Sequence, residues 1–270
     1  MNNIPKIILK VLLTGILFAG LQSPISAQDN AVDYGPIVTD RPDATEAPRL
    51  VPIHYLQVET GGFYETFEGD TFNFDRYVYN TTLMRYGLLK NLELRLGWNL
   101  EEQTTSINNS NLQNTLRGLS PLLLGVKVAV AEEKGGMPEI GLIGHIFLPF
   151  TAGTDFKPET TGVDFRFAFS HTLSEKENLS YNIGAQWGDD SPEIAYIYTL
   201  AYGYAITDKF GAYAEIYGDL PENSQANHLW DIGGTFLMQP NIQFDITMGS
   251  SFTQGQDILL SAGVSFRIPN

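Results

Sequence analysis

Charged side chains that alternate with apolar ones are the groups in this sequence best placed to do chemistry. In LELRLGWNL, residues 92–100, Glu93 and Arg95 alternate with leucines. Successive side chains of a strand point to opposite faces, so a strand here separates a charged face from an apolar face. The charged faces of several such strands could form a selective pore lining or a network of ion pairs.

The same separation recurs in six of the clearest predicted strands, whose apolar faces carry no charged residue. A Lys or Arg facing lipid at mid-bilayer costs about 2–4 kcal/mol, which gives this pattern a physical cause. We therefore expect the apolar faces to contact lipid and the charged faces to line a lumen. The predicted lining residues are Glu59, Arg85, Glu93, Arg95, Lys127, Asp164, Arg166, Glu215, Asp231, Asp245 and Arg267. Both a selective pathway and a narrow barrel filled by salt bridges agree with this set.

A second group of charges precedes the first predicted strand. Asp40, Arg41, Asp43 and Glu46 are interspersed with prolines in a segment without periodicity, residues 28–52, which we call the leader. One interpretation is a plug that folds into the lumen, pairs with inward charges and gates passage. The other is a periplasmic tether stiffened by proline. Repeated prolines reduce the entropy lost when a segment is fixed, which favours the plug.

Catalytic and metal-binding patterns are weak. Ser170 and His171 are adjacent, so in a strand they point to opposite faces and cannot pair. His54, His145 and His228 fall on separate predicted strands without the spacing of metal ligands. We expect no enzyme activity, no cofactor and no metal. A lipid hydrolase or acyltransferase at the membrane edge is the minor alternative, which a lipase assay would test.

The first residues have the pattern of a secretory signal peptide. Lys6 and Lys10 precede an apolar run at 11–21, and Ala27 is a small residue suited to cleavage. The predicted division is therefore a signal peptide at 1–27, the leader and possible plug at 28–52, and a barrel domain at 53–270.

Composition narrows the class of protein. With 31 acidic and 16 basic residues the net charge is −15, which argues against a nucleic-acid partner. The sequence contains no cysteine, so disulfides and thiolate metal sites are excluded. After the signal peptide, no run of apolar residues is long enough for a spanning helix. An exported membrane protein of this kind must cross the membrane as a barrel.

The arrangement of predicted strands agrees with this class. About twelve strands follow residue 53, and short turns tend to alternate with longer loops, among them residues 103–121. This pattern predicts an all-β fold, a single antiparallel transmembrane barrel in the outer membrane of a Gram-negative bacterium. Aromatic belts are predicted at its two rims, from Trp98, Trp187 and Trp230 at one and Tyr86, Phe210 and Phe266 at the other.

Several segments resemble a family of bacterial outer-membrane transporters, the "MetA-pathway of phenol degradation" proteins. TDRPDATEAP at 39–48 is similar to the opening motif of that family, and LMRYGLLKNLELRLGWN at 83–99 to its second hairpin. DIGGTFLMQPNIQFDITMG at 231–249 is similar to its penultimate hairpin. IFLPFTAGT at 146–154 departs from the shorter turn usual there.

The resemblance implies transport of small solutes, aromatic or hydrophobic ones included, across the outer membrane. We therefore expect a passive channel whose partners are outer-membrane lipid, a small-molecule solute and the barrel-assembly machinery. The alternative is a barrel with a closed lumen that serves a structural or adhesive role through its external loops.

Overall fold

The computed structural model of the chain describes residues 34–69, 71–108, 110, 112–188, 193–252 and 255–269. The predicted signal peptide and the first part of the leader, residues 28–33, lie outside the described residues. By its contacts the chain divides into two units, Met1–Tyr34 and Gly35–Asn270. The second unit contains the described strands and most of the leader.

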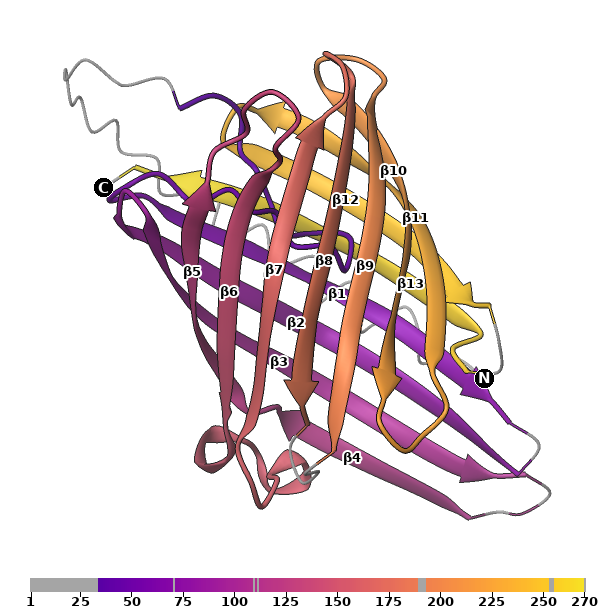
Figure 1. Cartoon of the computed structure of the whole chain (residues 1–270). Coiled ribbons are helices and arrows are strands. Elements are labelled where there is room, and N and C mark those ends of the chain that lie inside the picture. Colours follow the sequence, from indigo (N-terminus) through magenta and orange to yellow (C-terminus); the bar gives the residue numbers. More distant parts are fainter. Residues whose placement is uncertain are drawn as a thin grey trace. The chain divides into compact units, whose positions relative to one another are not determined.

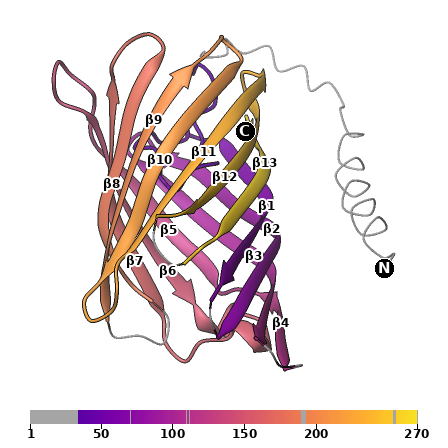
Figure 2. The ribbon, with the colours of Figure 1, turned by 90° about the vertical axis from the view of Figure 1, so that its right-hand side faces the viewer.

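The described strands form one closed antiparallel barrel (Figure 1). In chain order they are β1 (Leu56–Glu68), β2 (Phe72–Leu89), β3 (Leu92–Ile107), β4 (Gln113–Leu119), β5 (Leu122–Ala131), β6 (Glu139–Leu148), β7 (Gly162–Thr172), β8 (Glu177–Trp187), β9 (Ile194–Ala205), β10 (Phe210–Pro221), β11 (Asn227–Gln239), β12 (Ile242–Ser251) and β13 (Ile258–Ile268). β1 pairs with both β2 and β13, and β2 pairs with β3, which closes the sheet (Figure 2). Closure pairs each strand of the ring with two neighbours, as spanning a membrane with strands requires, and only β4 has a single partner strand, β3, among the described pairings.

β4 corrects the predicted loop at residues 103–121. β3 continues to Ile107, and β4 pairs with residues 100–106 of β3, whereas β5 pairs with residues 92–97. β4 and β5 therefore follow each other along the same edge of β3, and the barrel has twelve strand positions with one extra strand. The stretch EEQTTS at 101–106 has no apolar alternation, so its strand structure is not visible in the hydrophobic pattern.

The two faces of the wall differ as predicted. On the outside, Ile246 is 65% exposed and Ile183 59%, whereas Lys127 and Arg85, which point inward, are 0% exposed. A soluble domain would bury the first kind of residue and expose the second. This inversion, in a closed barrel, confirms the predicted transmembrane fold.

The two ends of the barrel carry different connections. At what we call the turn end, short turns join β2 to β3 and β11 to β12. At the loop end, β6 and β7 are joined by a longer segment with two 3₁₀ turns, η2 (Pro149–Thr151) and η3 (Thr154–Phe156). This segment includes most of IFLPFTAGT at 146–154, the stretch that departs from the shorter turn usual in the family that the sequence resembles. No helix among the described residues is both long and apolar enough to cross a membrane.

Candidate functional site

The described part of the leader passes through the interior of the barrel and is held at the turn end on both sides. Ile37 donates its backbone N–H to the carbonyl oxygen of Pro240, in the β11–β12 turn, at 2.7 Å. After the interior segment, Ile53 forms a bridge with Gly87 of β2, and His54 adopts a φ of 66° as the chain turns towards β1. The leader is therefore a loop inserted from the turn end, drawn in indigo in Figure 1.

Asp40 lies at the centre of a buried ion cluster. Its carboxylate is 3.2 Å from Arg85 Nη1, 2.8 Å from Arg95 Nη1 and 2.9 Å from Lys127 Nζ. Two wall carboxylates complete the cluster: Glu59 and Glu93 lie 2.8 and 2.9 Å from the Arg85 guanidinium. The wall thus contributes three cations and two anions, and Asp40 supplies the third anion.

This environment determines the charge of Asp40. Burial alone would raise the pKa of its carboxyl, but Arg85, Lys127 and Arg95 overcome that effect and lower the pKa. Burying an ion costs free energy unless it is paired, so removing any member of the cluster leaves an uncompensated charge.

Arg41 occupies a slot in the wall formed by β1, β12 and β13. Its Nη2 lies 2.8 Å from Asp245 Oδ1 and donates to Ser261 Oγ at 3.0 Å. Gly61 and Gly263 face each other across the β1–β13 pairing, and a Cβ on Gly263 would overlap the guanidinium. The two glycines therefore make room for the Arg41 side chain.

The next leader residues contact an acidic part of the wall. Ala44 donates its backbone N–H to Glu215 Oε2 at 2.8 Å, and the Thr45 hydroxyl donates to Glu215 Oε1. Asp43 faces the carboxylates of Glu215 and Asp231. Burial and these two negative charges raise the pKa of Asp43 well above its ordinary value.

The leader then returns along the cationic wall. Glu46 lies 2.6 Å from Arg95 Nη2 and 3.7 Å from Arg166 Nη1. Burial would raise the pKa of Glu46, but these two cations lower it. Val51 donates its backbone N–H to Glu93 Oε2 at 2.8 Å. The leader is thus bound by side chains from many strands, through both its charges and its backbone.

The remaining predicted lining residues also point inward but have other partners. Asp164 accepts a hydrogen bond from His145 Nδ1 at 3.0 Å. Arg267 donates to the carbonyl oxygen of Gly35 at 2.7 Å, and its guanidinium lies 5.9 Å from the centre of the Tyr55 ring. Asp231 has one oxygen, Oδ1, without a hydrogen-bond partner among the described residues.

Several uncharged wall residues that bind the leader were not predicted, and three of them illustrate the pattern. Gln57 donates to the carbonyl oxygen of Val38 at 2.8 Å, Asn182 donates to that of Glu46 at 2.9 Å, and Thr199 bonds to the Thr45 hydroxyl at 2.7 Å. All three occupy inward positions of their strands, so the period-two pattern could have identified them.

The candidates for catalysis have separate partners. Ser170 Oγ accepts a hydrogen bond from Ser180, and His171 Nε2 lies 3.5 Å from the Tyr181 hydroxyl. Their side chains therefore do not form a nucleophile and base pair in this geometry.

The predicted belt residues lie at different heights on their strands. Trp187 is the last residue of β8 and Phe210 the first of β10, whereas Trp98 lies well inside β3. Trp230 is near the start of β11, Tyr86 near the end of β2 and Phe266 near the end of β13. Their placement at the membrane interfaces stays a prediction.

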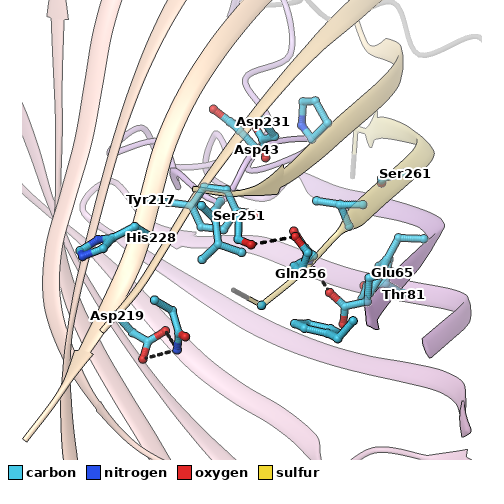
Figure 3. Close-up of a pocket in the computed structure, with 18 of the residues that line it drawn as sticks. Asp43, Glu65, Thr81, Tyr217, Asp219, His228, Asp231, Ser251, Gln256 and Ser261 are labelled. Carbon is cyan, nitrogen blue, oxygen red and sulfur yellow. Dashed lines mark hydrogen bonds between the residues drawn. The ribbon is translucent and has the colours of Figure 1, made fainter. Parts of the chain in front are cut away.

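Three cavities adjoin the leader. One, of about 490 Å³, opens among loop-end residues such as Glu65, Asp219 and Gln256 (Figure 3). A second, of about 490 Å³, is lined at the turn end by residues 174–178. Arg41, Pro42 and Asp43 line both. The third, of about 680 Å³, lies beside Arg95, Arg166 and His145 and includes Phe147 and Phe156.

A closed antiparallel barrel with an apolar exterior and a charged interior defines an outer-membrane β-barrel. The chain belongs to the family described as "Putative MetA-pathway of phenol degradation", whose model matches residues 39–268. This match confirms the resemblance seen in the sequence. No protein with a curated description matches the chain.

Solved outer-membrane barrels share the fold. The COG4313 outer membrane channel from Pseudomonas putida F1 superposes with a TM-score of 0.62 at 12% identity, covering 81% of this chain and 97% of that one. The NanC porin gives 0.50 at 13% identity, with coverage of 78% and 100%. The translocator domain of the autotransporter NalP from Neisseria meningitidis gives 0.52 at 10% identity, with coverage of 81% and 90%. These likenesses show the fold. The closed barrel with its exposed apolar wall places the protein in the bacterial outer membrane.

Proposed function

We propose that this protein is a passive channel for small solutes and that the leader is a plug that partitions its lumen. The supporting observation is that Arg41, Pro42 and Asp43 line a cavity towards each end of the barrel. In an outer-membrane barrel the short turns face the periplasm, so the two cavities would be an outer and a periplasmic vestibule. Movement of a few leader residues would connect them.

The leader is held in the lumen by ion pairs and hydrogen bonds, which can be replaced by contacts with water or with a solute. Asp40 and Glu46 carry charges that match the surplus of wall cations, and most other contacts are single hydrogen bonds. Such a segment can dock in one position and still leave it without unfolding the strands, because the strands pair with each other through the closed ladder.

We infer further that the solutes are small and include aromatic or hydrophobic compounds. The family description names phenol degradation. Aromatic side chains also line the loop-end cavities, Phe63, Phe67 and Tyr217 in one and Phe147 and Phe156 in the other. A mainly apolar surface with a few polar groups is typical of sites for such molecules.

A closed structural or adhesive barrel is the second candidate. It is favoured by the buried ion cluster around Asp40, which fills part of the lumen. Purified protein reconstituted in liposomes distinguishes the two, since a channel admits small solutes such as phenol or benzyl alcohol and a closed barrel remains tight.

A variant sharpens this experiment. Replacing Asp40 by Asn and Glu46 by Gln removes the two leader carboxylates that pair with wall cations, so permeation should rise several-fold. Glu132→Gln, an exposed carboxylate in the β5–β6 turn, is the matched control and should behave as the wild type. Liposomes that stay tight with the wild type and with the double variant would contradict the channel.

A further inference from the structure

We propose that the loop-end cavity of Figure 3, which we call the acidic cavity, binds small organic cations that carry an ammonium group on a short apolar body. The proposal deepens the proposed function and rests on it for the position of the cavity on the solute path. It concerns a class of solute that the family description does not mention.

The acidic cavity has an excess of acidic over basic side chains. Four carboxylates line it, those of Asp43, Glu65, Asp219 and Asp231, whereas Arg41 is the one Lys or Arg among its described lining residues. Arg41 is already engaged by Asp245 at 2.8 Å. Among the described lining residues, no Lys or Arg is therefore left free to pair with these acids.

Two of the four carboxylates have partners. Glu65 lies 3.1 Å from Arg76 Nη1 and accepts from the Gln256 amide at 2.6 Å. Asp219 accepts from the Asn227 amide at 3.0 and 3.2 Å, contacts that satisfy hydrogen bonds without neutralising its charge. Figure 3 shows the contact of Glu65 with Gln256 and the contacts that Asp219 accepts.

The other two carboxylates lie together at the inner end of the cavity. Asp231 is 2% exposed, and its Oδ1 has no hydrogen-bond partner among the described residues. Asp43, from the leader, lies beside it in Figure 3. No cation forms an ion pair with either side chain in the described part of the chain. A buried carboxylate oxygen without a partner is costly, so a cationic donor reaching Asp231 would gain a strong contact.

The cavity walls suit the apolar part of such a solute. Phe63, Phe67 and Tyr217 line the cavity beside the acids, and Leu229 and Leu259 add apolar surface. The Arg76 guanidinium already lies over the Phe63 ring at 5.2 Å, a contact between a cation and an aromatic face in the same wall. Aromatic faces together with carboxylates are the pattern that recognises ammonium groups.

Other classes of ligand fit less well. An anion would meet a lining with four acidic side chains, and a neutral solute would offer Asp231 Oδ1 no charged donor. Among the described residues, no group of three or more His, Asp or Glu side chains is arranged to hold a metal ion. The organic cation is therefore the class that both the charge and the aromatic lining favour.

Isothermal titration calorimetry of the full barrel in an uncharged detergent tests the proposal. Benzylammonium, benzyl alcohol and benzoate share a ring and differ in charge. We expect benzylammonium to bind about tenfold more tightly than the other two, and Asp231→Asn to remove that advantage. Glu132→Gln, outside the cavity, should leave it unchanged. Equal binding of the three compounds, or full binding by Asp231→Asn, would overturn the proposal.

A second variant and a second ligand complete the binding experiment. If Asp231→Asn does not fold, judged by the gel mobility of unheated protein, Asp43→Asn replaces it with the same expectation. Ammonium chloride should bind more weakly than benzylammonium, and equal affinity would refute the role of the aromatic walls. If benzylammonium binds preferentially in detergent but the liposomes stay tight to all solutes, the channel proposal is contradicted and the acidic-cavity proposal is not. If the liposomes are permeable but benzylammonium binds no more tightly than the other compounds, the acidic-cavity proposal is contradicted and the channel proposal is not.

Discussion

Asp40 and Asp43 are three residues apart, and their environments are opposite in charge. Asp40 contacts Arg85, Arg95 and Lys127, whereas Asp43 faces Glu215. The pKa of Asp40 is lowered because these cations outweigh its burial, and the pKa of Asp43 is raised by burial and nearby carboxylates. One residue thus holds the leader in the lumen as an anion, and the other opposes docking when it is ionised.

Substituting the two aspartates should change stability in opposite directions at neutral pH. Asp40→Asn leaves a surplus wall cation buried, which costs about 3–5 kcal/mol in the free energy of unfolding. Asp43→Asn removes a repulsive charge and should be neutral or stabilising. Urea unfolding in lipid vesicles measures both, and equal losses for the two variants would contradict the assigned environments.

The same two residues predict a dependence on pH. The pKa of Asp43 in the folded protein is raised. Its contribution to the free energy of unfolding is therefore present below the ordinary carboxyl pKa of about 3.9 and is lost as pH rises through the raised pKa. The pKa values of Asp40 and Glu46 in the folded protein are lowered. Their contribution to the free energy of unfolding is therefore present above the ordinary carboxyl pKa and is lost as the pH falls below it. The unfolding midpoint should therefore be highest in mildly acidic buffer, and its fall towards alkaline pH should be shallower in Asp43→Asn. An identical alkaline slope in both proteins would contradict this.

At the scale of elements, β1 and β13 are adapted to the leader. Gly61 and Gly263 are paired across these strands, and Arg41 enters the space that their missing side chains leave. The two glycines of these strands thus accommodate Arg41 of the leader and do not serve the pairing of β1 with β13.

Gly263→Ala should therefore displace Arg41 and separate it from Asp245. Introducing one methyl group at such a contact costs about 1–3 kcal/mol. Gly136→Ala is the matched control, because a Cβ there would meet nothing within 4 Å. Unfolding midpoints of the two variants give the comparison, and a Gly263→Ala protein as stable as the Gly136→Ala protein would show that the slot is not required.

The strands and their inward charges could be predicted because lipid imposes apolar residues at every second position. β4 was missed because the polar stretch at 101–106 and its partner have no such constraint. The partners of individual leader charges could not be predicted either. They depend on the register of the strands and on the path of a segment without periodicity, so that Asp40 and Asp43 look equivalent in the sequence.

At the scale of the whole molecule, the barrel reverses the arrangement of a soluble protein. Isoleucines such as Ile246, 65% exposed, cover the outside, and the charged groups are inside. This arrangement is stable only when hydrocarbon contacts the outer side chains and the charged groups inside form ion pairs.

A cation on the outer wall should therefore prevent stable insertion. Ile246→Lys, in the middle of β12, should cost about 2–4 kcal/mol in the bilayer, whereas Met238→Lys, next to the β11–β12 turn, should cost about 0–1 kcal/mol. Folding yields into vesicles provide the measurement. Equal yields would mean that Ile246 does not face lipid.

Whether the leader partitions the lumen is tested most directly by fixing it to the wall. The chain has no cysteine, and the hydroxyls of Thr45 and Thr199 are 2.7 Å apart, so Thr45→Cys with Thr199→Cys creates a single bridge between leader and β9. The measurement is permeation of benzyl alcohol into liposomes that contain the double variant, before and after reduction. We predict slow entry with the disulfide formed and several-fold faster entry once it is reduced. Equal entry in both states, with the disulfide verified, would contradict a mobile plug.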